Sequence, residues 1–246
     1  MKSPAQDWTQ PFDLLREKWV EIPVGAERRK SSDMLQLPMH ELWTLWQESR
    51  NEVAEGDFGC RGWYYSFYKD VLRDKRVLDV GSGFGYDGIT FALAGARVTF
   101  LDIVESNLAI VRRLCEYRQV ANADFFYMSD LDSLAQLQGQ FDIIWCCGSL
   151  INLPFILAQR ESQELLRHLV PHGRWIELAY PQARWEREGR LPFERWGERT
   201  DGGAPWMEWY DLKKMLARLA PHQFRVVLQF SFHNDDFNWF DLEHVA

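Results

Sequence analysis

Apolar residues recur with two different spacings along most of the chain. Short, nearly continuous apolar runs predict strands, and the segments between the first five runs carry apolar residues three and four positions apart, which predicts helices. The predicted strands are 77–80, 97–101, 124–128, 141–147, 174–178, 225–232 and 237–240. Phe141–Cys147 is apolar at almost every position, as is typical of a parallel strand covered on both faces. Strands that alternate with helices predict an α/β fold.

Two further helices are predicted before the first strand. Pro11 begins one helix, with Phe12, Leu15 and Trp19 on one side, and Pro38 begins a stronger one. The second carries Met39, Leu42, Trp43 and Trp46 on a single face. The polar stretch 21–33 between them is predicted to be a loop. The apolar face of the second helix either packs on the sheet or caps a site at its edge.

Residues 57–68 are dense in aromatic side chains and contain two glycines. Because this segment directly precedes the first strand, it can fold over the edge of the sheet. Arg61 would then be placed to meet a ligand carboxylate, and Tyr64, Tyr65 and Tyr68 to donate hydrogen bonds. The alternative interpretation is an ordinary packed aromatic helix.

The first strand runs into a turn with glycine at every second position, Gly81, Gly83 and Gly85. Glycines let the backbone turn tightly and approach a ligand closely, because they have no Cβ. A dinucleotide-binding fingerprint would need its third glycine at position 86, where this chain has Tyr86. The turn is therefore a candidate nucleotide site of another kind, unless it binds nothing.

Polar residues follow the strands at the edge where an open α/β sheet binds its ligands. Asp102 ends the second strand and is placed to accept hydrogen bonds from a ribose diol. Ser149 and Asn152 follow the fourth strand, which ends at Cys147. A cysteine nucleophile is disfavoured here, because no His–Asp pattern accompanies Cys146 and Cys147 and buried core thiols are common.

Composition narrows the class of protein. The 246 residues are 46% hydrophobic and suit one α/β domain with additions, and the net charge of −8 argues against a nucleic-acid partner. The four cysteines have no zinc-ligand spacing, so no metal is expected and reduced thiols fit best. Without an apolar leader or membrane-length run, the sequence predicts a soluble, cytoplasmic protein with no membrane partner.

Residues 77–85, Val-Leu-Asp-Val-Gly-Ser-Gly-Phe-Gly, match the first motif of class I S-adenosylmethionine-dependent methyltransferases. The chain resembles that family over roughly residues 70–246. The resemblance implies a Rossmann-like, doubly wound, seven-stranded sheet with an antiparallel last strand. It also implies an N-terminal helical cap at 1–70, a methyltransferase domain at 71–246, and S-adenosyl-L-methionine as cofactor.

The resemblance also assigns the cofactor-binding residues. Gly81, Ser82, Gly83 and Gly85 would admit its amino-acid end, and Asp79 would face the ammonium. Asp102 would hold the ribose, Ile103 would also bind the cofactor, Asp130 and Leu131 would meet the adenine, and Cys147 would lie near the cofactor or the transferring methyl. Asp130-Leu131-Asp132 also has the D-x-D pattern of some metal sites, which the adenine role and a helix N-terminus already explain.

The acceptor side is less defined. The irregular stretch 181–209, with Trp185, Trp196, Trp206 and Trp209, suits either an acceptor pocket or an oligomer interface such as a homodimer. A small-molecule hydroxyl, on a sugar or a natural product, is the favoured acceptor. Relatives often carry histidine after the fourth strand and this chain does not, so the catalytic base is unassigned. Tyr64, His233 and Asp235 are weak candidates for it, and a polar hairpin tip is the plainer interpretation of the last two.

Two alternatives from other classes stay open. One is an NAD(P)-binding oxidoreductase, which Asp102 and the glycines favour and which Tyr86 and Asp79 oppose. The other is a non-catalytic protein that keeps the fold to bind a partner, which the missing base permits.

Overall fold

The computed structural model describes residues 9–22, 28–56, 59–200 and 203–245. The start of the aromatic segment, Asp57 and Phe58, and Gly202 of the insertion lie outside these ranges. The seven strands are β1 (Arg76–Val80), β2 (Arg97–Asp102), β3 (Ala123–Tyr127), β4 (Phe141–Cys147), β5 (Leu169–Ala179), β6 (Gln223–Phe232) and β7 (Phe237–Val245). All seven predicted strands are therefore present.

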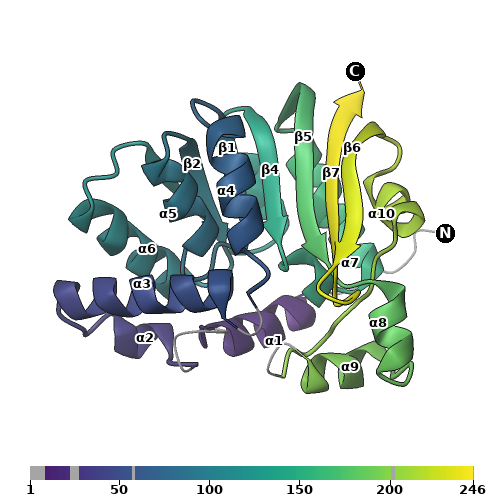
Figure 1. Cartoon of the computed structure of the whole chain (residues 1–246), viewed down its shortest axis with the longest axis horizontal. Helices are drawn as coiled ribbons and strands as arrows, with labels where there is room; N and C mark the ends of the chain where they lie inside the picture. Colours follow the sequence, from purple (N-terminus) through teal and green to yellow (C-terminus); the bar gives the residue numbers. More distant parts are fainter. Residues whose placement is uncertain (1–8, 23–27, 57–58, 201–202, 246) are drawn as a thin grey trace.

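The strands form one sheet in the order β3-β2-β1-β4-β5-β7-β6 (Figure 1). The first five pair in parallel, and β7 runs antiparallel to both of its neighbours, β5 and β6. From β1, the strands β2 and β3 extend the sheet on one side, and β4 and β5 extend it on the other. The carboxyl ends of β1 and β4 therefore meet where the strand order switches. The predicted fold class, including the antiparallel last strand, is confirmed.

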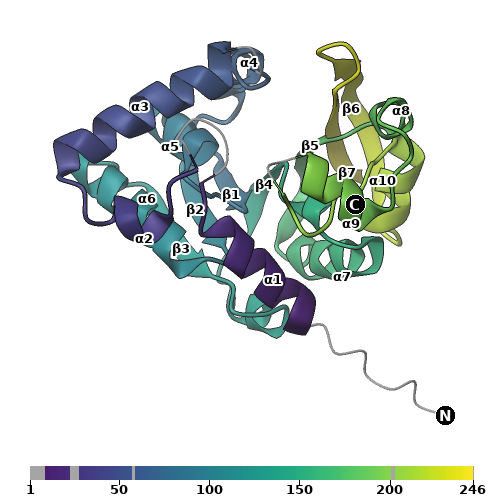
Figure 2. The ribbon, with the colours of Figure 1, turned by 90° about the horizontal axis from the view of Figure 1, so that it is seen from below.

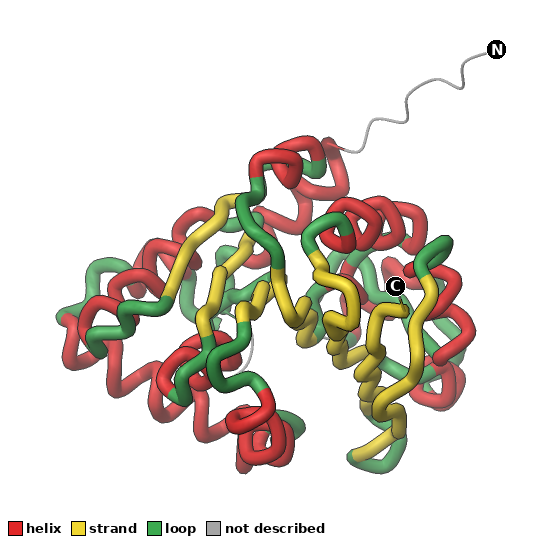
Figure 3. Tube along the Cα trace, turned by 90° about the horizontal axis from the view of Figure 1, so that it is seen from above, coloured by secondary structure: helices red, strands yellow, loops and turns green. Residues whose placement is uncertain are grey.

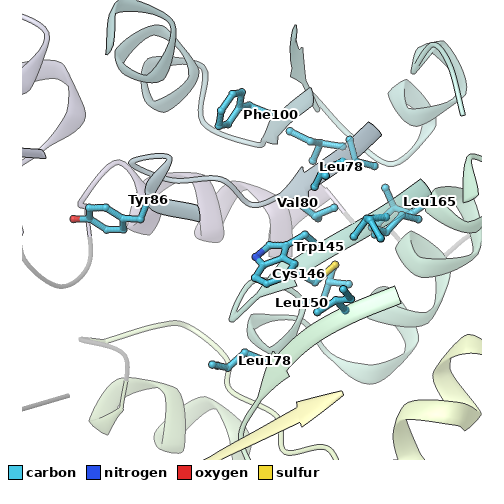
Figure 4. Packing of buried hydrophobic residues seen from close by; sticks show 14 of the residues in the cluster. Leu78, Val80, Tyr86, Phe100, Trp145, Cys146, Leu150, Leu165 and Leu178 are labelled. Atoms are coloured by element: carbon cyan, nitrogen blue, oxygen red, sulfur yellow. The ribbon is translucent and has the colours of Figure 1, made fainter. Parts of the chain in front are cut away.

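Helices cover both faces of the sheet (Figure 3). On one face lie α4 (Gly62–Val71), α5 (Tyr86–Leu93) and α6 (Glu105–Tyr117), and on the other α7 (Phe155–Leu166) and α10 (Leu212–Leu219). The core between these layers includes Trp145 and Cys146 of β4, with Leu150 and Leu165 beside them (Figure 4). Packing on both faces explains why β4 is apolar at almost every position.

The N-terminal helices lie outside this layered body. They are α1 (Thr9–Trp19), α2 (Ser31–Met34) and α3 (Met39–Glu55). α3 packs across α4 and α6, whereas α1 crosses below the carboxyl edge of the parallel strands (Figures 1 and 2). Of the segment predicted to form a cap, α1 is the part at the ligand edge, whereas α3 packs on α4 and α6. No described helix has both the length and the apolar character needed to cross a bilayer.

Two local predictions were wrong, each because a distant contact decides the backbone. The predicted loop at 21–33 contains α2, where the buried Ser31 hydroxyl lies 2.6 Å from the Ser106 hydroxyl. β5 begins at Leu169, well before the predicted residue 174, because Leu169 pairs with Phe141 of β4.

The irregular stretch 181–209 contains two short helices, α8 (Gln182–Arg187) and α9 (Phe193–Arg199). Its tryptophans act mainly as internal supports. Trp196 is fully buried and donates to Glu188 at 2.6 Å, and Trp185 donates to the Leu191 carbonyl at 2.8 Å. These rings hold the insertion together rather than form an aromatic pocket wall.

Candidate cofactor and acceptor site

The glycine turn after β1 is held in left-handed backbone geometry. Gly81, Gly83 and Gly85 have φ values of +68°, +54° and +72°, which side-chain-bearing residues rarely adopt. A Cβ on Gly81 would lie 2.5 Å from the Cβ of Ser149, so the close approach to the loop after β4 also requires glycine. A Cβ on Gly83 would meet nothing within 4 Å, which leaves this peptide open.

Gly85 has a different role from the one predicted. A Cβ there would meet the Val111 and Ile89 side chains at 3.0–3.1 Å, so Gly85 allows α5 to pack against α6. It does not line the cavity described below. Gly88 is similarly constrained, because its Cβ would lie 2.3 Å from the Phe100 ring and 2.5 Å from Asp79 Oδ2. Sequence reasoning missed Gly88, which does not belong to the alternating glycines.

Asp102 ties the end of β2 to the glycine turn. Its Oδ2 accepts a hydrogen bond from Gly83 N at 2.7 Å, and its Oδ1 accepts one from Val104 N at 2.8 Å. Burial raises the pKa of Asp102 to about 6, although these backbone donors favour the charged form. Each carboxylate oxygen keeps acceptor capacity for a ligand hydroxyl.

Asp79 lies in β1 directly before the turn and is buried. Its Oδ2 accepts a hydrogen bond from Gly88 N at 3.2 Å. Burial and the nearby negative charge of Asp87 raise the pKa of Asp79 well above its usual range. A cation that reached Asp79 would find a carboxyl group without a counterion in direct contact among the described residues.

Asp87, at the start of α5, is the centre of a buried polar cluster. Arg61 Nη1 donates to both of its oxygens at 2.8–2.9 Å, Tyr65 donates at 2.7 Å and Trp145 Nε1 at 2.9 Å. Tyr64 adds a longer bond of 3.1 Å. Although burial opposes ionisation, the Arg61 charge and these donors hold the pKa of Asp87 below its ordinary value. The cluster joins α4 to the helix that follows the glycine turn.

The aromatic segment is therefore mainly structural. Tyr64 and Tyr65 are committed to Asp87, and Tyr68 donates to Asp241 at 2.6 Å. The packed-helix interpretation is the better description of these three side chains. Arg61 is the exception, because it also lines the cavity and contacts Asp87 through Nη1.

A cavity of about 770 Å³ opens along the carboxyl edge of the sheet. One part is bounded by the predicted cofactor residues Asp79, Gly81, Ser82, Gly83, Asp102, Ile103 and Cys147. Another part is bounded by residues near the insertion, namely Tyr180, Arg184, Glu198, Arg199, Thr200 and Phe237. The cavity is within the size range of small-molecule sites.

Other predicted residues are not brought to this cavity. Asp130 and Leu131 do not line it, and Asp130 Oδ1 instead accepts from Ser133 N at 2.7 Å, in the first turn of the 3-10 helix Asp132–Gln136. His233 and Asp235 lie at the β6–β7 hairpin tip and are also outside the cavity wall. All six histidines fall within the described residues, and none lines the cavity.

The two thiols of β4 point to opposite faces. Cys146 is buried in the core, whereas Cys147 faces the cavity and its sulfur lies 3.1 Å from the Tyr64 hydroxyl. Burial raises the pKa of Cys147 well above its usual range, so the neutral thiol prevails and nucleophilic catalysis is disfavoured. Within the described part of the chain, no group of three metal-ligating side chains occurs.

The residues present fit an adenosyl amino acid. Two buried hydroxyls beside the turn, Ser82 Oγ and Ser149 Oγ, have no hydrogen-bond partner in the described structure, and both residues line the cavity. The open peptide of Gly83 and the carboxylate of Asp102 lie at the same edge. A ligand with a cationic amino-acid end and a ribose would satisfy these groups.

Comparison with known proteins agrees with this geometry. Residues 77–173 match the family model described as methyltransferase domain. Ubiquinone biosynthesis O-methyltransferase of Aromatoleum aromaticum is 37% identical over 83 residues, covering 34% of this chain and 35% of that protein. The enzyme of the same name from Bordetella parapertussis is 36% identical over 108 residues, covering 43% and 42%. The matches therefore span about two fifths or less of these relatives.

The structural likeness extends further. Magnesium protoporphyrin IX methyltransferase from Synechocystis PCC 6803, crystallised with bound S-adenosylmethionine, aligns with a TM-score of 0.59 over 98% of this chain and 99% of that chain. The sequences are 16% identical, so the likeness concerns the fold. The chain therefore has the fold of class I S-adenosylmethionine-dependent methyltransferases, and its residues 77–173 match the methyltransferase-domain family model.

Proposed function

We propose that this protein transfers a methyl group from S-adenosylmethionine to an oxygen atom of a small-molecule acceptor. The observation that carries the proposal is one cavity that joins the glycine turn, Asp79 and Asp102 to the insertion after β5. The family match and the O-methyltransferase relatives support the same activity. Within it, a hydroxyl of a sugar or natural product is the acceptor that the sequence favours.

The chain offers a partner for each polar part of the cofactor. Asp79 would hold the ammonium, Arg61 the carboxylate and Asp102 the ribose diol. Gly81 and Gly83 leave room for the backbone to approach closely. The bound sulfonium supplies a methyl group that is already activated toward nucleophiles. Holding the acceptor in line with that methyl is then the protein's main contribution.

The acceptor side combines a stacked cation with a carboxylate. The Arg184 guanidinium lies 4.1 Å from the Tyr180 ring centroid, and its Nε donates to Glu188 at 2.9 Å. Glu198, also in the cavity wall, is exposed. Asp87 is unsuited to accept the acceptor's proton, because Arg61, Tyr65 and Trp145 already use its oxygens. An acceptor hydroxyl acidic enough to ionise readily suits these surroundings.

One observation keeps the non-catalytic alternative in view. Each weak candidate for the base, Tyr64, His233 and Asp235, lies outside the cavity wall. A protein that binds the cofactor but turns over no acceptor would have the same cofactor half. The oxidoreductase alternative has less support, since Tyr86 begins α5 where a dinucleotide fingerprint would have its third glycine.

Titration calorimetry with S-adenosylmethionine, S-adenosylhomocysteine and NADH tests the proposal. We expect both sulfur ligands to bind wild type and Asp102→Ala to weaken them at least tenfold, or about 1.4 kcal/mol. Asp142→Ala is the matched control, because Asp142 accepts from Arg76 N at 2.8 Å but lies outside the cavity. Binding of NADH alone would refute the proposal. If the two sulfur ligands bind, an assay of methyl transfer from labelled cofactor to phenolic and sugar hydroxyls would identify the acceptor class.

A further inference from the structure

The helix α1 presents an apolar face to the cavity. Phe12, Leu15 and Trp19 lie on one side of this helix and line the cavity, together with Ile22 just beyond it. Phe12 and Leu15 are each only 4% exposed. The same cavity is also lined by Leu101, Asp102 and Ile103 at the end of β2. α1 is thus a wall of the part of the cavity that faces the predicted ribose carboxylate.

Two polar contacts attach α1 to the segments that follow β2 and β3. Asn107, in α6 after β2, donates from Nδ2 to the Trp19 carbonyl at 3.1 Å. The Arg16 guanidinium donates to the Ser129 carbonyl, which follows β3. Both attachments lie on the side of the sheet where Asp102 emerges, and neither involves the insertion after β5. The position of α1 is therefore defined relative to the ribose side of the cavity.

Asn107 links α1 to Asp102. Because a carbonyl can only accept, the contact with Trp19 assigns the nitrogen of the Asn107 amide to that side. The same nitrogen lies 3.5 Å from Asp102 Oδ1. Asn107 is 2% exposed and lines the cavity, and its Oδ1 has no hydrogen-bond partner among the described residues. A buried acceptor without a donor is costly, so a ligand hydroxyl would relieve it.

We propose that α1 forms the roof of the nucleoside half of the cofactor site, and that Asn107 couples the position of α1 to ribose binding at Asp102. The inference rests on the function proposed above. The apolar face of α1 packs against the nucleoside, with Trp19 as its largest ring. This wall takes the place of the adenine contacts expected from Asp130 and Leu131, which lie outside the cavity wall.

A coupling of this kind is reciprocal. A nucleoside that contacts α1 stabilises its docked position, and a docked α1 raises the affinity for the nucleoside. The amino-acid end of the cofactor would bind at Asp79 and Gly81, at the end of β1, whereas the α1 contacts are made by Asn107 and Ser129, which follow β2 and β3. The nucleoside part alone should therefore stabilise α1, whereas the amino-acid part alone should not.

Hydrogen exchange of the α1 backbone amides tests this directly. The intact protein is measured alone and with saturating S-adenosylhomocysteine, adenosine or methionine. We expect exchange over residues 12–19 to slow at least tenfold with S-adenosylhomocysteine and with adenosine, and to be unchanged with methionine. Equal exchange in all four states, or slowing by methionine alone, would overturn the inference.

Variants test the named contacts. We expect Asn107→Ala and Trp19→Ala each to weaken S-adenosylhomocysteine at least tenfold in calorimetry and to abolish the slower exchange of α1. Asn122→Ala is the matched control, because Asn122 also donates to a backbone carbonyl, Ala92 O at 3.1 Å, but lies outside the cavity. Trp43→Ala is the control for ring loss, since Trp43 stacks on Trp46 in α3.

The outcomes separate the two proposals. Wild type that fails to bind S-adenosylhomocysteine refutes the proposed function, and the inference with it. Wild type that binds it while α1 exchange and the two variants' affinities are unchanged refutes the inference alone. If Asn107→Ala does not fold, as near-ultraviolet circular dichroism would reveal, the comparison of adenosine with methionine on wild type still decides.

Discussion

Replacing Asp87 by asparagine should strongly destabilise the protein, because it leaves the Arg61 charge without its counterion. The Asp87 carboxylate is 4% exposed and accepts from Arg61, Tyr65 and Trp145 within 2.9 Å. Asparagine keeps the size but offers one acceptor oxygen and no charge. At least one donor then loses a good partner, and Arg61 loses its neutralising charge.

The magnitude follows from the burial of the pair. Removing one partner of a buried ion pair costs about 3–5 kcal/mol. The Arg61 side chain is 23% exposed, so part of its charge can be solvated and we expect the lower end, about 3 kcal/mol. Arg61→Leu should cost less, because the remaining Asp87 can take up a proton while a guanidinium cannot lose one. Its cost should therefore grow as the pH rises.

Urea unfolding followed by circular dichroism measures these differences, and the double variant completes a cycle. We expect the double variant to be less destabilised than the sum of the singles by at least about 1 kcal/mol. Asp70 and Arg73 provide a surface control, a pair at 2.7 Å whose side chains are 66% and 59% exposed. The same cycle there should yield a coupling below about 1 kcal/mol.

The result that would refute this reasoning is a loss below about 1 kcal/mol for Asp87→Asn, the level of a surface pair. Arg61→Leu proving more damaging than Asp87→Asn would equally contradict it. Either outcome would mean that water in the cavity solvates the Arg61 charge, and that the cluster does not support the α4–α5 contact.

Three further predictions concern burial and pH. Burial raises the pKa of Glu161 to about 8. Between about pH 4.5 and 8 the folded state therefore binds more protons than the unfolded state, and the free energy of unfolding falls as the pH rises. Glu161→Gln should remove this pH dependence and raise the free energy of unfolding at pH 7, measured with urea, by up to about 3 kcal/mol. If the stabilities of variant and wild type changed in parallel with pH, the prediction would be wrong. Because the pKa of Asp102 is raised to about 6 and a ribose diol needs the ionised form, S-adenosylhomocysteine affinity should fall about tenfold per unit below pH 6 in calorimetry, and a flat profile would contradict ribose binding there. Gly88→Ala should cost about 1–3 kcal/mol, since its Cβ would lie 2.3 Å from the Phe100 ring, and an unchanged melting temperature would show that the contact relaxes freely.

The strands and the glycine turn could be predicted from sequence because their signals are local. An apolar run such as Phe141–Cys147 and alternating glycines after β1 depend on residues adjacent in the chain. Asp102 was predictable for the same reason, since parallel strands of a doubly wound sheet end at one edge. The cofactor was inferred from the family resemblance, because the spacing of apolar residues carries no information about a ligand.

The tertiary structure decided which polar side chains meet. Asp87 joins Arg61, directly before α4, and Trp145 of β4, which lie 26 and 58 positions away in the chain, and no local pattern marks it as the centre of a cluster. Asp130 was predicted to face the adenine, but in the structure its carboxylate accepts a hydrogen bond from Ser133 N. α1 was recognisable as a helix, yet its place over the cavity depends on Asn107, 88 residues beyond Trp19. Periodicity determines which face of an element is apolar, whereas contacts between distant segments determine what that face covers.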